Sequence, residues 1–147
     1  LPLSSAVEVD GMLYLSGALG TVAGGGLAAG GIGPETRQTM ENIKSLLASE
    51  GLTMDRVVKC TVMLADIKEW PAFNAIYADY FDRNYPARSA FAASGLALGA
   101  RVEVECMAKR RWGYGDRCNN PLIIPHTSFY LGVIARVTVM ENIVDYR

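Results

Sequence analysis

Residues 101–106 read Arg-Val-Glu-Val-Glu-Cys, a strict alternation of charged and apolar side chains. Successive side chains of a β-strand point to opposite faces, so the valines and the cysteine would enter a core while Glu103 and Glu105 share the other face. Two carboxylates on one face need a partner, and the arginines nearest in sequence are Arg88 and Arg101. The planar fork of an arginine suits a carboxylate, whether of a side chain or of a ligand. The alternative is that all these charged groups are solvated, as most are.

The chain around this strand predicts a single α+β domain. Residues 6–9 and 12–16 flank Asp10-Gly11, a strong turn signal, and predict an opening hairpin. The other expected elements are a helix that starts at Pro34 and is closed by Gly51, a strand over 57–64, a helix over about 69–82, and strands near 89–93 and over 101–108. The order ββαβαββ is typical of a two-layer fold in which two helices cover one face of a mixed sheet.

The other face of that sheet has no predicted cover. It would carry Glu103 and Glu105 beside Met63 and Met107, a mixture poorly suited to water alone. Self-association through this face is the simplest way to bury it.

Composition narrows the class of protein. With 147 residues, of which 50% are hydrophobic and 20% charged, the chain can bury one good core. A net charge of −1 gives no field that would attract nucleic acid. No apolar run reaches the length of a membrane span. The only histidine is His126 and no Cys/His cluster exists, so we expect no metal site.

The cysteines and the ends of the chain bear on its setting. Three cysteines at wide spacing predict buried, reduced thiols and a cytoplasmic location rather than a disulfide framework. The chain begins at Leu1 rather than Met, so removal of an upstream segment stays open. Residues 1–111 are expected to form the domain, and 112–147 a C-terminal extension of unknown role that carries no motif. The glycine-rich stretch 20–33 matches no phosphate-binding fingerprint and is interpreted as a loop.

Several short motifs follow one another along the chain. They are residues 15–17 (Leu-Ser-Gly), residues 39–43 (Thr-Met-Glu-Asn-Ile), residues 57–62 (Val-Val-Lys-Cys-Thr-Val), Phe73-Asn74 with Tyr77, residues 85–89 (Tyr-Pro-Ala-Arg-Ser) and residues 102–105 (Val-Glu-Val-Glu). In this order they resemble the YjgF/RidA family, over about residues 2–110.

The resemblance implies a fold, an assembly and an activity. Members of that family are trimers with a chorismate-mutase-like fold, and their ligand clefts lie between subunits. Three sheets packed into a central core would then cover the bare face. Many members are enamine/imine deaminases, which hydrolyse reactive 2-aminoacrylate-type intermediates to a 2-keto acid and ammonia without a cofactor.

The resemblance also implies roles for the charged residues. Arg88 matches the arginine that grips the substrate carboxylate, and Glu103 matches the glutamate that orients or activates the attacking water. An Arg88 close to Glu103 would keep that carboxylate ionised and favour its action as a base. Glu105 is expected to support structure, paired with Arg101 or with a neighbouring subunit.

Four further positions match residues that line the family's cleft. They are Ser16, Gly17, Asn74 and Ala90, and Ala90 stands where many members have a cysteine, so any contact there must come from its backbone N–H. One departure concerns the start of the chain, where Leu3 replaces a tyrosine that is common in the family. The change removes a hydroxyl group that would help close the cleft.

Three functions are therefore under consideration. The first is hydrolytic deamination of small 2-imino acids by a homotrimer with sites between subunits. The second is a non-catalytic trimer that binds small keto or carboxylic acids as a sensor or interaction protein, which the loss of the tyrosine at Leu3 favours. The third is a ribonuclease, against which the neutral charge balance argues.

Overall fold

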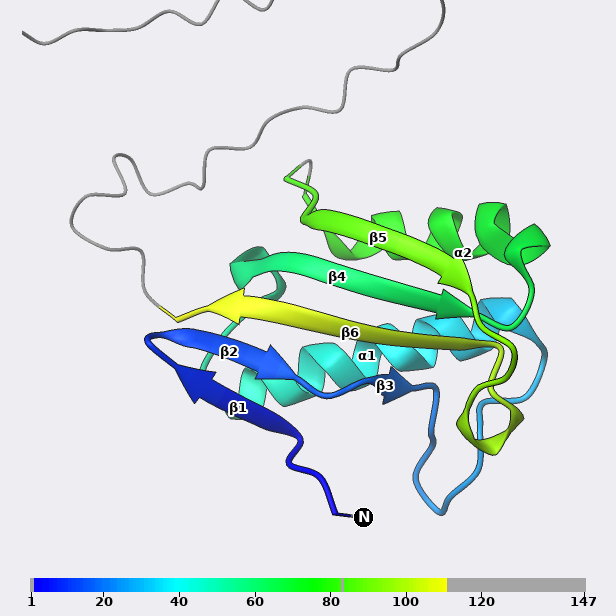
Figure 1. Cartoon of the computed structure of the whole chain (residues 1–147), viewed down its shortest axis with the longest axis horizontal. Helices are drawn as coiled ribbons and strands as arrows, with labels where there is room; N and C mark the ends of the chain where they lie inside the picture. Colours follow the sequence, from blue (N-terminus) through cyan, green and yellow to red (C-terminus); the bar gives the residue numbers. More distant parts are fainter. Residues whose placement is uncertain (1, 83, 111–147) are drawn as a thin grey trace, which may run out of the picture.

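Figure 1 shows the computed structural model, in which one sheet lies in front of two helices. It describes residues 2–82 and 84–110. The strands are β1 (Ala6–Val9), β2 (Met12–Leu15), β3 (Ala18–Leu19), β4 (Val57–Leu64), β5 (Ala87–Ala92) and β6 (Val102–Lys109), and the α-helices are α1 (Ile32–Ser49) and α2 (Trp70–Tyr77). The expected two-layer α+β fold is confirmed.

The alternating strand β6 lies at the centre of the sheet. The order is β1-β2-β6-β4-β5, and among the described strands only β4 and β5 pair in parallel, so the sheet is mixed as expected. The opening hairpin of β1 and β2 is confirmed as well. The sequence missed β3, which pairs with β6, because two residues are too few to leave an alternating pattern.

The core lies between the sheet and the two helices. The apolar side chains within the stretch 101–106 are at most 2% exposed. Glu103 is half-buried and Glu105 is exposed, as the alternation predicts. The largest fully buried side chains that they meet are Met40, Ile43 and Leu47 of α1, Phe73 of α2, and Val62 and Leu64 of β4.

Both helices differ from the prediction at their ends. α1 begins at Ile32, before Pro34, because a proline in the first turn gives up only an N–H that has no helical partner. The chain leaves α1 through Gly51, whose φ of 70° suits a glycine. α2 ends at Tyr77 and continues as a 3-10 turn over Ala78–Tyr80, so the expected helix to residue 82 is too long.

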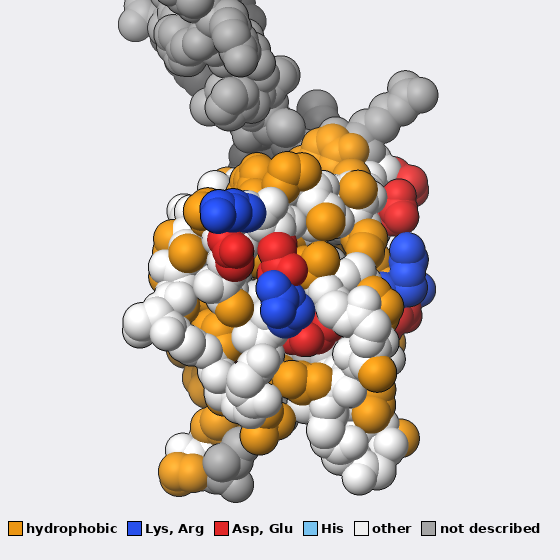
Figure 2. Space-filling model, turned by 90° about the vertical axis from the view of Figure 1, so that its right-hand side faces the viewer, with side chains coloured by type: hydrophobic (Ala, Val, Ile, Leu, Met, Phe, Trp, Pro, Cys, Tyr) orange, Lys and Arg blue, Asp and Glu red, His pale blue; other side chains and the backbone are white. Residues whose placement is uncertain are grey.

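Of the two partners expected for Glu105, Arg101 pairs with Glu69 instead, while a neighbouring subunit stays a prediction. Nε of Arg101 lies 2.8 Å from Oε1 of Glu69, just before α2, and the nearest guanidinium nitrogen lies 2.6 Å from the same oxygen. Arg101 immediately precedes β6, so its side chain is free to turn toward the start of α2. Figure 2 looks onto this end of the molecule and shows acidic and basic side chains side by side near its middle. Glu105 makes no hydrogen bond or ion pair with any described residue.

The prediction of reduced thiols is wrong for two of the three cysteines. Cys60 and Cys106 are joined by a disulfide. They stand directly opposite each other on β4 and β6, and both are buried on the helix side of the sheet. Cross-strand neighbours bring their Cβ atoms close, a proximity that a separation of 46 residues hides in the sequence. Reduced thiols therefore no longer support a cytoplasmic location. The third cysteine, Cys118, lies outside the described residues.

The face of the sheet turned away from the helices has no cover within the described part of the chain (Figure 1). Val7, Tyr14 and Phe91 on this face are 42–53% exposed, beside the half-buried Met63 and Met107. No helix among the described residues is long and apolar enough to cross a membrane. The expected C-terminal extension, 112–147, falls outside the described residues.

Candidate functional site

Arg88 lies on the edge strand β5 and faces α2. It stands beside Cys60 in the parallel pairing of β4 and β5, which puts its side chain on the helix side of the sheet. The centre of its guanidinium lies 4.4 Å from the centroid of the Trp70 ring and 4.5 Å from that of Tyr77. A third ring, that of Phe73, lies at 5.8 Å. A cation over aromatic faces is attracted by the negative charge above each ring, so this aromatic box holds Arg88 without using its N–H donors.

Two polar side-chain groups near Arg88 lack a hydrogen-bond partner within the described part of the chain, and both belong to α2. Among the described residues, the buried Tyr77 hydroxyl and the buried Oδ1 of Asn74 have no hydrogen-bond partner. Burial raises the pKa of the Tyr77 hydroxyl, and the nearby charge of Arg88 offsets part of that rise, so the phenol stays protonated. Burial also lowers the pKa of Arg88, but an arginine remains a cation at neutral pH. The guanidinium and these two polar atoms therefore lie near one helix, each without a hydrogen-bond partner among the described residues.

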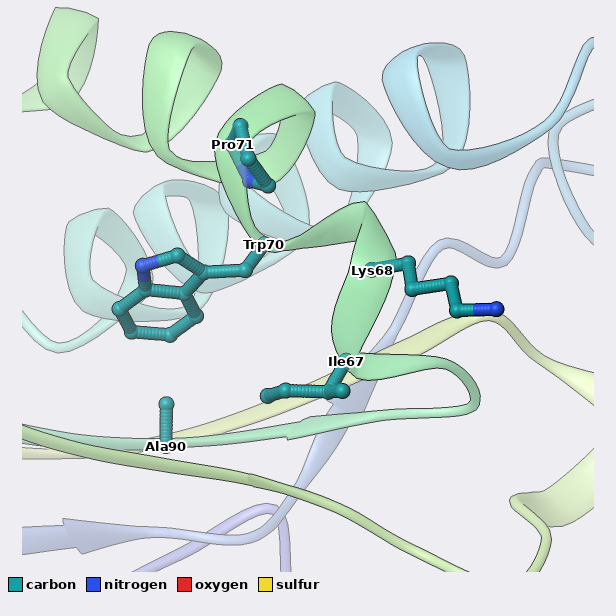
Figure 3. A pocket seen from close by; sticks show the side chains of 5 residues that line it. All are labelled: Ile67, Lys68, Trp70, Pro71 and Ala90. Carbon is teal, nitrogen blue, oxygen red and sulfur yellow. The ribbon is translucent and has the colours of Figure 1, made fainter.

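An open hollow adjoins the aromatic box. It has a volume of about 440 Å³ and is lined by Ile67, Lys68, Trp70, Pro71 and Ala90. Figure 3 shows the Trp70 ring and the Ile67 side chain over Ala90, while Lys68 points away from them. Ala90 follows Arg88 by two residues on the same face of β5, so the small methyl group leaves this space open.

Glu103 and Gly17 form a second group on the opposite side of the sheet. Glu103 stands beside Leu19 in the pairing of β3 with β6. A Cβ at Gly17 would overlap Oε1 of Glu103 and come within 2.9 Å of its Cδ, so the carboxylate lies directly against the Gly17 backbone. Between the pairs Tyr14–Met107 and Ala18–Val104 the β2–β3 side advances one residue more than β6, which produces a bulge at this point.

Ser16 connects this second group to the start of the chain. Its Oγ donates a hydrogen bond to the Ser4 carbonyl at 2.6 Å, and its N–H donates to the Ser5 carbonyl at 3.0 Å. Leu3, 59% exposed, is therefore held close to Ser16 and the bulge.

The six expected site residues do not come together within one chain. Arg88 and Ala90 face the helices and Asn74 lies on α2, whereas Glu103 is on the bare face, against Gly17 and next to the bulge that holds Ser16. Within a single chain, Arg88 therefore does not lie close to Glu103. The reason is the parity of the strands: Arg88 aligns with Cys60 and Glu103 with Met63, and these two residues of β4 point to opposite faces.

Substituting Gly17 tests the contact with Glu103. Gly17→Ala places a methyl group where Oε1 of Glu103 now lies, and the flexible carboxylate can swing away at little cost to folding. If Glu103 acts in catalysis, we expect hydrolysis of an imino acid to fall about tenfold or more while the thermal unfolding temperature changes little. Gly95→Ala is the matched control, because its Cβ would meet nothing within 4 Å. Equal rates for the two variants would contradict the prediction.

The mixed sheet with two helices on one face, the bare opposite face and the divided charged groups define a chorismate-mutase-like α+β domain. The profile of the endoribonuclease L-PSP family matches residues 1–110. A 2-iminobutanoate/2-iminopropanoate deaminase of Capra hircus is 44% identical over 108 residues, which are 73% of this chain and 79% of that protein. The chain belongs to the endoribonuclease L-PSP family, the YjgF/RidA family that its motifs predicted.

Solved structures agree with this assignment. The L-PSP protein of Entamoeba histolytica has 45% identity and a TM-score of 0.71, over 74% of this chain and 87% of that one. E. coli TdcF with bound serine has 26% identity and a TM-score of 0.70, over 75% of this chain and 89% of that one. The predicted family and fold are therefore confirmed.

The sequence missed the surroundings of Arg88. The aromatic residues of 70–81 recur at helical spacing, a pattern typical of core packing, yet Trp70 and Tyr77 also hold the arginine. Their spacing of seven residues puts both rings on one helix face, which was visible in the sequence. That β5 would present Arg88 to this face was not visible, because it depends on the register of β4 with β5.

Proposed function

We propose that this protein hydrolyses small 2-imino acids and their enamine forms to 2-keto acids and ammonia. The Capra hircus relative carries the name of this activity, and the family match includes both Arg88 and Glu103. The observation that carries the proposal is the state of Arg88, whose guanidinium is held by aromatic rings yet makes no hydrogen bond or ion pair with a described residue. An arginine fork in that state suits the carboxylate of a ligand.

The proposed chemistry needs only water. Arg88 binds the substrate carboxylate and so places the imine carbon near Glu103. Glu103 accepts a proton from water while the water oxygen bonds to that carbon, and the proton then passes to the nitrogen. In the resulting carbinolamine the hydroxyl proton passes to the amino group, the C=O double bond forms as the C–N bond breaks, and ammonia and the keto acid leave. The N–H of Ala90 and the polar atoms of Ser16, Gly17 and Asn74 would line the cleft.

We also propose that a homotrimer completes the site between neighbouring chains. One chain would supply Arg88, Asn74 and Ala90, and the next would supply Glu103 with its bulge. Two observations support this arrangement: the two groups lie on opposite faces of one sheet, and the face that carries Glu103 exposes apolar side chains. Self-association would cover that face and bring the two groups together.

A coupled assay tests the activity. An amino-acid oxidase generates a 2-imino acid in solution, and release of the keto acid is followed with and without the protein. We expect the protein to accelerate this release for small aliphatic imino acids. A rate equal to that of spontaneous hydrolysis would refute the proposed function.

Complementation between two inactive variants tests the shared site. Arg88→Ala and Glu103→Gln trimers should each be nearly inactive, but refolding them together produces sites with Arg88 from one chain and Glu103 from the next. Random mixing gives an intact pair at about a quarter of the sites, so about a quarter of wild-type activity should return. No recovery in trimers shown by native mass spectrometry to be mixed would contradict a site shared between chains.

The second candidate is a trimer that binds small carboxylates without turnover. The exposed Leu3 near Ser16 favours it, because its side chain offers no hydroxyl to help close the cleft. Titration calorimetry with 2-ketobutyrate distinguishes the two, since this candidate requires Arg88-dependent binding in a protein that fails the coupled assay.

The ribonuclease alternative rests on the family's description alone. A cytoplasmic location stays a prediction.

A further inference from the structure

The start of β6 is fixed by a buried carboxylate on another element. Glu35 lies in the first turn of α1 and is only 4% exposed. Its Oε1 accepts hydrogen bonds from the N–H of Arg101 at 2.7 Å and from the N–H of Val102 at 3.3 Å. Burial of a carboxylate is costly unless hydrogen-bond donors satisfy it. The position of the carboxylate therefore depends on these two N–H groups, and the position of the N–H groups depends on the carboxylate.

Other contacts make this junction rigid. The side chain of Arg101 forms the ion pair with Glu69, and its carbonyl accepts a hydrogen bond from the N–H of Ala65 at 2.9 Å. Val102 is fully buried. Glu103 is the next residue, so the backbone that carries it leaves a junction anchored to α1, to the start of α2 and to the end of β4.

Glu35 also touches the strand on the other side of Glu103. A Cβ at Gly20 would lie 2.6 Å from the carbonyl oxygen of Glu35 and 2.7 Å from its Cγ, so the chain leaving β3 packs directly on Glu35. That segment continues from Gly17, which lies against the carboxylate of Glu103, and from Leu19, which pairs with Glu103 across the sheet. Glu35 therefore contacts both backbone segments that bring Gly17 and Glu103 together.

We infer that Glu35 is a positioning residue for Glu103. It touches no part of the proposed substrate site, and it acts by holding the backbone of β6 and of the β3 segment in register. The inference rests on the proposed role of Glu103 in hydrolysis. If Glu35 merely stabilised the fold, its loss would lower the amount of folded protein and leave kcat per folded molecule unchanged.

Kinetics of three variants test this role. In Glu35→Ala the two N–H groups lose their acceptor, and we expect kcat to fall about 10- to 100-fold with KM within about threefold, because substrate binding depends on Arg88. Glu35→Gln keeps an acceptor oxygen and should retain kcat within about threefold. Lys44→Ala, whose side chain is 58% exposed on the same helix, is the control and should match the wild type. An unchanged kcat in folded Glu35→Ala, a change confined to KM, or a failure of Gln to rescue would each overturn the inference.

Amide hydrogen exchange gives a readout that does not depend on turnover. Glu35→Ala should speed exchange of the Arg101 and Val102 amides while the central strand β4 stays protected. If the wild type proves inactive, the proposed function fails, and the exchange data still show whether Glu35 holds this segment; unchanged exchange would overturn the inference. Should Glu35→Ala not fold, Glu35→Asp replaces it, since the shorter side chain withdraws the carboxylate from the two N–H groups and predicts a loss of kcat in the same direction.

Discussion

Replacing Arg88 with alanine should lower kcat/KM for imino-acid hydrolysis by about 100- to 1,000-fold. Truncating one partner of a charge-assisted, partly desolvated pair typically costs about 2 to 5 kcal/mol, or about 30- to 5,000-fold, and the expected loss lies in the middle of that range. The loss should appear in binding as well, because the carboxylate of a substrate or keto acid would have no counter-charge. Steady-state kinetics and calorimetry with 2-ketobutyrate measure both effects.

Two further substitutions serve as comparisons for Arg88→Ala. Arg88→Lys keeps the charge but not the fork, so we expect an intermediate loss rather than full activity. Arg37→Ala removes an exposed arginine from α1 and should match the wild type. Loss of the contacts with Trp70 and Tyr77 should cost about 1 to 2 kcal/mol of folding stability, so Arg88→Ala should remain folded. A folded Arg88→Ala variant with the full rate would refute the proposed role.

Replacing Glu103 with glutamine should lower kcat by about 100- to 10,000-fold, the range that general acid–base catalysis contributes. The amide has nearly the same shape as the carboxylate but cannot accept a proton from water. Binding of 2-ketobutyrate should persist, because Arg88 is unchanged. The Arg88 and Glu103 variants therefore differ in kind: the first loses binding and rate, the second only rate.

Glu105→Gln is the matched control for Glu103→Gln. Both glutamates lie on β6, two residues apart and on the same face, but Glu105 lacks the contact with Gly17. We expect Glu105→Gln to keep wild-type kcat. Equal losses in the two variants would show that the face needs its charge and not a particular base.

The fold was readable from the sequence because its signals are local. The alternation of residues 101–106 set the inner and outer faces of β6, and the Asp10-Gly11 turn set the opening hairpin. The short β3 could not be predicted, because its two residues are strand only through pairing with β6. The Cys60–Cys106 bond depends likewise on the register of two distant strands.

The candidate site was predicted less well than the fold. Arg88 and Glu103 were singled out by their charge and by the family resemblance, but their separation by the sheet required the register of β5 against β4. From the sequence, Glu35 is only an acidic residue in the first turn of a helix, where it complements the helix dipole. Its hydrogen bonds to the start of β6 span 66 and 67 residues, and no local pattern reports contacts of that length.

The stacking of Arg88 on Trp70 gives the protein an optical reporter of its own. The chain has two tryptophans, and the other, Trp112, lies outside the described residues. With Trp112→Phe, the remaining indole emits beside a cation 4.4 Å from its ring centroid. A carboxylate that draws the guanidinium away changes the electric field at that ring, and with it the emission. Fluorescence would then report ligand occupancy apart from turnover and separate a slow hydrolase from a protein that never binds the acid.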